Sequence, residues 1–276
     1  MPTGAPFRGL VTILDVVPPA QSVGAHLAAK LQSFASDERT LTDELCDMLC
    51  IWLSAMAATP SGHPPFLLEL EKTTAPVEVI TGADLELVVS SPLGFKRCLL
   101  QAKVLDPASR KLRCAYKQGW EDLRVQLAKA RASAGDLAFL LVYVPGDLLN
   151  GNRYGYSTYE QQFLTAASGS LEAFLGATVI AVNDLLAPND QWIDPVNKVR
   201  ELTPGQFHAG IPFWRFLLEL MLCLRSSWQV DTPVSAQDNA QPFRSLSMGA
   251  KEVSRDTWNE IQAIGTEWLR SHGGEV

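Results

Sequence analysis

Hydrophobic and polar positions follow two different periods along the chain. Within residues 21–58, apolar side chains recur three and four positions apart, which predicts helical structure with one buried face. Residues 77–90 and 95–105 instead have strand-like patterns, and Gly82 marks a bend within the first of them. We expect a strand, a bend and a second strand over 77–90, and a hairpin that pairs it with 95–105.

Two further segments are apolar without a break. Residues 137–144 and 176–183 show no polar alternation, which is typical of strands buried on both faces of a sheet. A short strand is expected near 66–70, and the remaining helices are expected over 116–132, 156–175, 213–228 and 251–271. The pattern predicts one α/β domain with a mixed central sheet, in which 1–183 form the core and 184–276 form a helical C-terminal extension packed on it.

Composition narrows the class of protein. The chain has 276 residues, of which 47% are hydrophobic and 19% charged, so a sizeable core is expected and global disorder is excluded. No apolar run reaches about 18 residues, and the N-terminal sequence does not resemble a secretion signal. The five cysteines are an odd number in apolar surroundings, which favours reduced thiols and a cytoplasmic protein.

Charge is distributed unevenly along the sequence. Residues 96–131 carry ten basic side chains against three acidic ones, a local balance of +7 that leaves −14 for the remainder of a chain with net charge −7. A basic segment on an acidic body can contact a polyanion locally while the body avoids non-specific binding. The same segment is also compatible with an ordinary solvated helix face, and on charge alone this is the favoured interpretation, because such charge runs are common on surfaces.

The candidate chemistry lies on the predicted hairpin. Side chains two apart on a strand share a face, so Asp84 lies with Glu86, and Gln101 lies with Lys103. Asp84, the amide of Gln101 and the carbonyl of Ala102 would offer hard oxygen ligands to Mg²⁺ or Mn²⁺. Such an ion activates water and neutralises phosphate charge, which suits phosphodiester hydrolysis.

Other side chains would assist this site. Lys103 would orient the attacking water or stabilise the transition state. Glu44, on the preceding helix, would contact the metal through water and act as an auxiliary ligand, and Glu78 and Glu86 are further candidate helpers.

The order of these residues resembles a known nuclease superfamily. Asp84, followed after sixteen residues by Gln101-Ala102-Lys103, is similar to the PD-(D/E)XK motif in its variant with Gln in place of the usual acid. The resemblance covers roughly residues 38 to 145, and the strings TGADLEL and LLQAKVL are similar to a group of bacterial restriction-endonuclease-like proteins.

The resemblance implies a fold, a substrate and residue roles. It implies a restriction-endonuclease-like core, nucleic acid as partner with DNA favoured, and a role in restriction or anti-phage defence in a bacterial cytoplasm. It also implies that Gln126 and Lys129, on the helix after the motif, reach the scissile phosphate. Arg124 would hold a flanking phosphate, which positions nucleic acid without reading its sequence.

Three other interpretations stay open at this point. Asp84 can simply cap a turn while Lys103 extends along a sheet edge. The fold can also belong to an inactive subunit that binds nucleic acid or a protein, because Gln101 is uncharged. Finally, the apolar helix near 211–228 is hydrophobic nearly all round, so it is buried either in the fold or against a partner, such as a second copy or a defence-complex subunit.

Overall fold

The structure, a computed structural model, describes most of the chain. The described segments are 17–33, 36–57, 67–91, 94–106, 112–113, 119–145, 176–193, 210–222, 224–225, 245–247 and 254–273.

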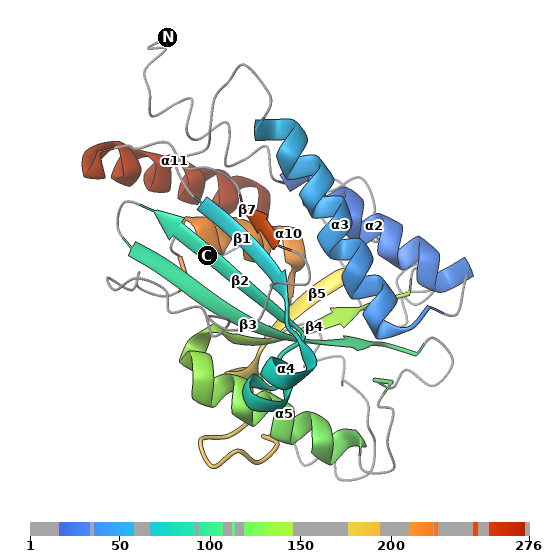
Figure 1. Cartoon of the computed structure of the whole chain (residues 1–276). Coiled ribbons are helices and arrows are strands. Elements are labelled where there is room, and N and C mark those ends of the chain that lie inside the picture. Colours follow the sequence, from blue (N-terminus) through green and yellow to red (C-terminus); the bar gives the residue numbers. More distant parts are fainter. Residues whose placement is uncertain are drawn as a thin grey trace.

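A mixed seven-stranded sheet runs through the middle of the molecule (Figure 1). Its strands lie in the order β6-β5-β4-β3-β2-β1-β7, in which β3 and β4 are parallel and all other neighbours are antiparallel. The strands are β1 (Leu67–Lys72), β2 (Leu85–Ser91), β3 (Gly94–Val104), β4 (Ala138–Tyr143), β5 (Ala177–Ala181), β6 (Ile211–Pro212) and β7 (Ser245–Ser247).

Helices cover both faces of this sheet. Figure 1 shows α2 (Val17–Ser33) and α3 (Glu38–Ala57) on one side and α5 (Gly119–Ala134) on the other. α5 packs on β3 and β4, whereas α10 (Phe213–Met221) packs on α2, β5 and β6. The predicted α/β class, with a mixed central sheet flanked by helices, is confirmed.

Most elements lie where the hydrophobic pattern predicts them. The helical region over 21–58 is two helices, α2 and α3, which pack against each other. The hairpin of β2 and β3 forms, and β4 is buried at every position, as its unbroken apolar run predicts. The predicted helix over 156–175 lies outside the described residues.

The predicted strand over 77–81 is wrong. Ala75–Thr81 form a short helix, α4, with a proline in its first turn and Gly82 as its C-cap. Its run of β-branched residues is typical of a strand, but a helix buries Val77 and Thr81 on one face and exposes Val79 and Ile80 on the other. Tertiary packing here overrides local propensity.

The C-terminal part of the chain completes the same sheet. β6 and β7 form its two edges, and α10 is buried along nearly its whole length within this chain's own fold. The apolar pattern of α10 is therefore explained without a partner. The final helix, α11 (Arg255–Gly273), adds the fully buried Trp258 to the core.

The described residues also bear on membrane spans and on two of the five cysteines. Among the described helices, none combines the length and the apolar character needed to cross a bilayer. Cys46 and Cys98 are both buried.

Candidate functional site

The site lies where β2 and β3 separate. β2 begins at Leu85, and its last pair with β3 joins Leu85 to Leu100. β3 continues to Val104, and among the described strands its residues beyond Leu100 pair only with β4. The backbone groups of β3 on the side of β2 therefore need other hydrogen-bonding partners beyond this fork.

Asp84 occupies the fork and supplies one of these partners. Its backbone is held from both sides, because its N–H donates to the carbonyl of Leu100 and its carbonyl accepts from the N–H of Thr73, both at 2.9 Å. Its carboxylate Oδ2 accepts the N–H of Ala102 at 2.7 Å and also accepts from Nε2 of Gln101. The alternation of side chains along the strands predicts that the Asp84 carboxylate and the Gln101 amide share a face, and in the structure the two groups are in contact.

Gly82 allows the chain to reach this position. It has a positive φ of 68°, and a Cβ there would lie 2.8 Å from the carbonyl carbon of Gln126 and overlap its oxygen. The turn after α4 therefore packs directly on the backbone of α5. Asp84 follows two residues later, so this close approach helps to fix the position of its carboxylate.

Lys103 is paired with an acid that the sequence did not single out. Its Nζ donates to both carboxylate oxygens of Glu38, at 2.8 and 2.9 Å. Glu38 is the first residue of α3 and follows Asp37, whose side chain accepts the N–H of Thr40 as in a helix N-cap. The Asp37 cap marks where α3 begins, and the fold brings this end of the helix to β3.

Glu44, the expected acid of α3, lies elsewhere. Its carboxylate is bonded by Lys30 of α2 and lies 3.5 Å from the Nε2 of His26. Six residues separate Glu44 from Glu38, so the two side chains point about 120° apart around the helix. The helix is therefore the expected one, but Glu38 is the acid that it brings to the fork.

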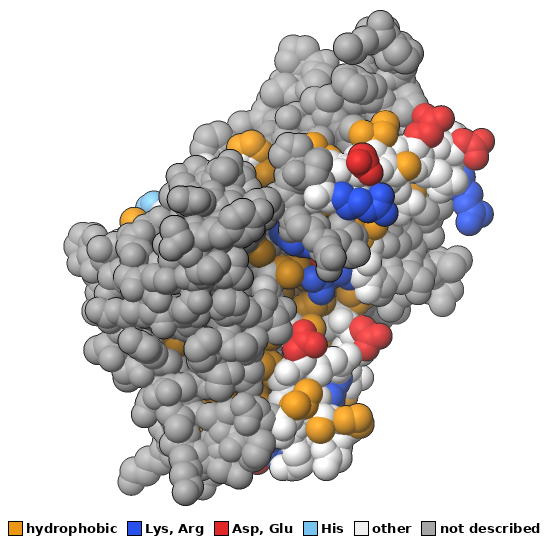
Figure 2. Space-filling model, turned by 180° about the vertical axis from the view of Figure 1, so that it is seen from behind, with side chains coloured by type: hydrophobic (Ala, Val, Ile, Leu, Met, Phe, Trp, Pro, Cys, Tyr) orange, Lys and Arg blue, Asp and Glu red, His pale blue; other side chains and the backbone are white. Residues whose placement is uncertain are grey.

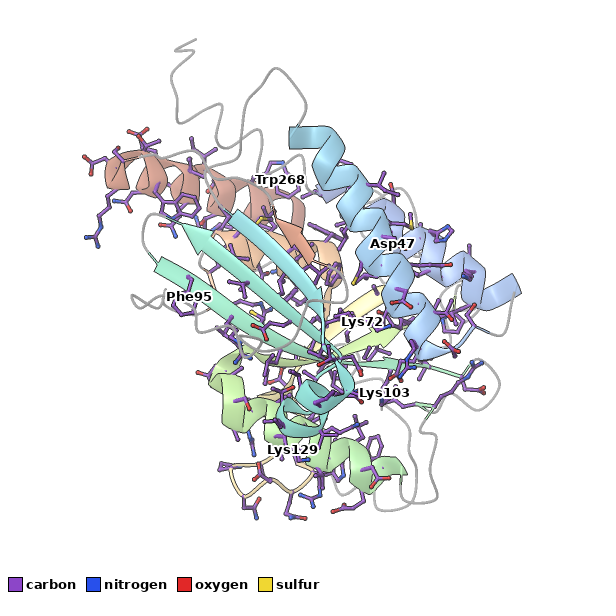
Figure 3. The ribbon with its side chains drawn as sticks, in the orientation of Figure 1. Asp47, Lys72, Phe95, Lys103, Lys129 and Trp268 are labelled. Carbon is purple, nitrogen blue, oxygen red and sulfur yellow. The ribbon has the colours of Figure 1, made fainter. Side chains whose placement is uncertain are left out.

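A cavity of about 390 Å³ opens beside the fork. Acidic and basic side chains both line it, and Lys72 is held by Asp43 at 2.7 Å. Arg39 also lines the cavity; it is exposed and makes no ion pair with another described residue. Figure 3 shows Lys72 and Lys103 at the same end of the sheet. The charged lining residues are Glu38, Arg39, Asp43, Lys72, Glu78 and Asp84.

Burial has the largest effect on the pKa of Glu38 and on that of Asp84. Burial raises the pKa of Glu38 to about 7, and the Lys103 ammonium opposes this rise. Burial also raises the pKa of Asp84, and the carboxylate of Glu78 adds to the effect. The Lys103 ammonium and the N–H of Ala102 act in the opposite direction on Asp84.

The oxygen atoms at the fork suit a hard divalent cation. Nε2 of Gln101 donates both to Oδ2 of Asp84 and, at 3.3 Å, to the carbonyl of Ala102, so these two oxygens lie within reach of one atom. In the described part of the chain, no group of three or more His, Cys, Asp or Glu side chains is placed to hold a metal. An ion here would rely on one carboxylate, one carbonyl, the amide and water, as Mg²⁺ tolerates.

The basic side chains of α5 contact protein groups instead of the cavity. Arg124 donates to Glu121 at 2.9 Å and to the carbonyl of Asp190 at 2.6 Å. Lys129 donates to the carbonyl of Val79 in the last turn of α4 at 2.8 Å, and Figure 3 shows it apart from Lys103. The side chain of Gln126 is also absent from the described lining of the cavity.

On the face seen in Figure 2, the basic side chains of the described residues do not form a separate patch. Figure 2 views the molecule from behind and shows basic and acidic side chains interspersed over the part of that face that is described. Arg131 likewise donates to the carbonyls of Leu186 and Ala187, both at 2.8 Å. The basic residues of α5 thus fasten neighbouring segments of the fold.

Glu86, a candidate helper, is held away from the fork. Arg97 donates to its two carboxylate oxygens at 2.7 and 2.9 Å, and Glu86 is almost fully buried. This ion pair satisfies both charges inside the protein.

Comparison with known proteins adds no family to these observations. No protein-family model matches the chain, and no curated protein matches it.

Proposed function

We propose that this protein is a divalent-metal-dependent nuclease with a restriction-endonuclease-like core. The observation that carries the proposal is the meeting of the Asp84 carboxylate, the Gln101 amide and the Ala102 carbonyl at the fork, with Lys103 two residues farther along β3. The substrate is nucleic acid, with DNA favoured, and restriction or anti-phage defence is the role that the motif suggests.

The order of elements supports this assignment. α3 brings an acid to the site, β2 and β3 follow with the motif, and α5 and the parallel strand β4 come next. The sequence resemblance to PD-(D/E)XK nucleases implies an acid on an early helix, the motif on two adjacent strands and a helix after it. The difference is that the acid on α3 is Glu38 instead of Glu44.

Hydrolysis adds one water across a P–O ester bond and leaves a phosphate monoester and a hydroxyl group. Asp84, Gln101 and Ala102 would hold Mg²⁺ or Mn²⁺, which lowers the pKa of bound water and neutralises phosphate charge. Lys103 has three N–H donors and uses two on Glu38, which leaves one for the attacking water or a phosphate oxygen.

Arg39 is the residue best placed to hold the substrate backbone. It lines the same cavity as Asp84 and is exposed, whereas Lys72 is engaged by Asp43 and Lys103 by Glu38. Its guanidinium matches a phosphate group and would contact the phosphate next to the scissile one.

The test compares cleavage of labelled DNA and RNA by three variants in Mg²⁺ and in EDTA. Asp84→Asn and Lys103→Met should each lower the cleavage rate by about 100-fold or more, because each removes a group that acts on the reacting phosphate. Asp122→Asn, an exposed acid on α5, is the matched control and should cleave like the wild type. Full cleavage by both site variants would contradict the proposal.

A second candidate is a nuclease-like subunit that binds nucleic acid or a protein partner without cutting. The bidentate hold of Glu38 on Lys103 and the neutral Gln101 favour it. In that case the wild-type protein would bind oligonucleotides in EDTA and in Mg²⁺ alike, and cleave them in neither. Calorimetric titration with Mn²⁺ distinguishes the nuclease from the inactive subunit. If the protein is a nuclease, Mn²⁺ binding should release or absorb heat in the wild type and not in Asp84→Asn.

A further inference from the structure

Gln101 is fully buried, yet only half of its amide is satisfied. Its Nε2 donates to Oδ2 of Asp84 and to the carbonyl of Ala102, while its Oε1 has no hydrogen-bonding partner among the described residues. A buried amide oxygen without a partner is costly, so an unused acceptor in an otherwise bonded cluster calls for an explanation.

The surrounding oxygens decide which way this amide points. With the NH₂ toward the fork, both of its donors have acceptors. With the amide turned over, Oε1 would face a carboxylate oxygen and a carbonyl oxygen, and three acceptors would meet without a proton among them. While Asp84 is ionised, the turned orientation becomes favourable when a positive charge lies between these oxygens.

We propose that Gln101 is a two-position amide that couples metal binding to a turn of its own side chain. This inference rests on the proposed metal site. In the metal-free protein the NH₂ group bridges Asp84 and Ala102 in the place of a cation. When a divalent ion binds, the amide turns about its terminal torsion, which is broad and roughly two-fold, and Oε1 faces the ion.

The proposal explains why an uncharged residue suits this position. A glutamate at 101 would place a second carboxylate against Asp84 in a buried site, and the two negative charges would repel each other until a cation arrived. The amide avoids this repulsion. The site can therefore stay folded without metal, with the amide N–H groups bonded, and still offer an oxygen to the ion, at the cost of weaker metal binding than two acids would give.

The most direct test observes the Gln101 amide by NMR in protein labelled with ¹⁵N at glutamine side chains. The signal is assigned by its absence in Gln101→Met. We expect a resolved NH₂ pair, slow to exchange with solvent, in EDTA, and a shift with faster exchange on titration with Mg²⁺. Asp84→Asn should show no such Mg²⁺-dependent shift. A Gln101 signal that stays unchanged while Mg²⁺ binds at Asp84 would overturn the amide turn and leave the metal site standing.

Thermal unfolding at pH 8 gives a second, independent readout. In EDTA, Gln101→Glu should unfold several degrees below the wild type, because of the paired carboxylates, and Mn²⁺ should raise its Tm by more than that of the wild type. Equal Tm values for the two proteins in EDTA would refute the role of the amide. If Mn²⁺ raises neither Tm and no calorimetric binding is seen, the metal site itself, and with it the proposed function, is contradicted.

Discussion

At the scale of single residues, Glu38 is the site residue with the most informative position. It holds the ammonium of Lys103 through both of its oxygens and lines the cavity with Asp84. It acts on the proposed reaction through Lys103, so it is a positioning residue. Glu44 lies on the same helix but bonds to α2, which makes it a natural comparison.

Glu38→Gln should lower the cleavage rate about tenfold or more, because Lys103 loses its charged partner and its fixed orientation. Glu44→Gln should lower it far less, since it changes a contact between α2 and α3. The measurement is the cleavage rate against pH, in which Glu38→Gln should also alter the profile near pH 7, where the carboxyl of Glu38 titrates. Equal losses in the two variants would contradict this assignment of the acid.

The sequence predicted the strand residues of the site and missed its helix residue. Asp84, Gln101 and Lys103 follow from two-residue alternation on paired strands, which depends only on local geometry. Glu38 depends on which end of α3 faces β3, and Arg39 depends on the cavity that forms there. Both are properties of packing between distant segments, which the local pattern does not contain.

At the scale of elements, the contact between α4 and α5 positions the fork. Gly82 ends α4 in the left-handed conformation, and its lack of a side chain lets the chain pack on the backbone at Gln126. Gly135, at the end of α5, also has a positive φ, of 59°, but a Cβ there would meet no atom within 4 Å. Substitutions at Gly82 and Gly135 therefore distinguish the cost of a left-handed backbone from the cost of a steric clash.

Gly82→Ala should lower the free energy of unfolding by about 3 kcal/mol or more, because it adds a backbone clash to left-handed strain. Gly135→Ala should cost only the strain, about 1–2 kcal/mol. Chemical denaturation measures both. A loss at Gly82 no larger than that at Gly135 would show that α4 does not press on α5 as closely as the structure places it.

The sequence predicted the existence of most elements better than the type of α4, the shortest α-helix among the described residues. The long periodic or apolar runs of α3, β3, β4 and α11 are strong signals, and each forms as expected. α4 is only seven residues long and rich in β-branched side chains, so local preference favours a strand. Its packing on α5 and the turn at Gly82 decide in favour of a helix.

At the scale of the whole molecule, segments far apart in the sequence join in one sheet, since β7 pairs with β1. The C-terminal part supplies both edge strands, β6 and β7, as well as α10 and α11. The sequence predicted the helices of this region but not its strands, which are only two and three residues long. Strands that short carry almost no pattern and form because a neighbouring strand presents free hydrogen-bonding groups.

The fold also changes the interpretation of the basic segment 96–131. The run of basic residues over 96–131 suggested a surface for nucleic acid. In the fold, Arg97, Lys103, Arg124 and Arg131 each contact a carboxylate, and Lys129 contacts a carbonyl. Local density of charge in a sequence therefore overstates the charge that is available to a partner.

The most direct measurement for the account as a whole is a crystal structure of the protein soaked with Mn²⁺, with anomalous scattering to locate the ion. The account predicts a peak at the fork, within about 2.5 Å of a carboxylate oxygen of Asp84 and of the carbonyl of Ala102, with the amide oxygen of Gln101 turned toward it. The peak should disappear in Asp84→Asn. A well-ordered fork without a peak at saturating Mn²⁺ would contradict the account.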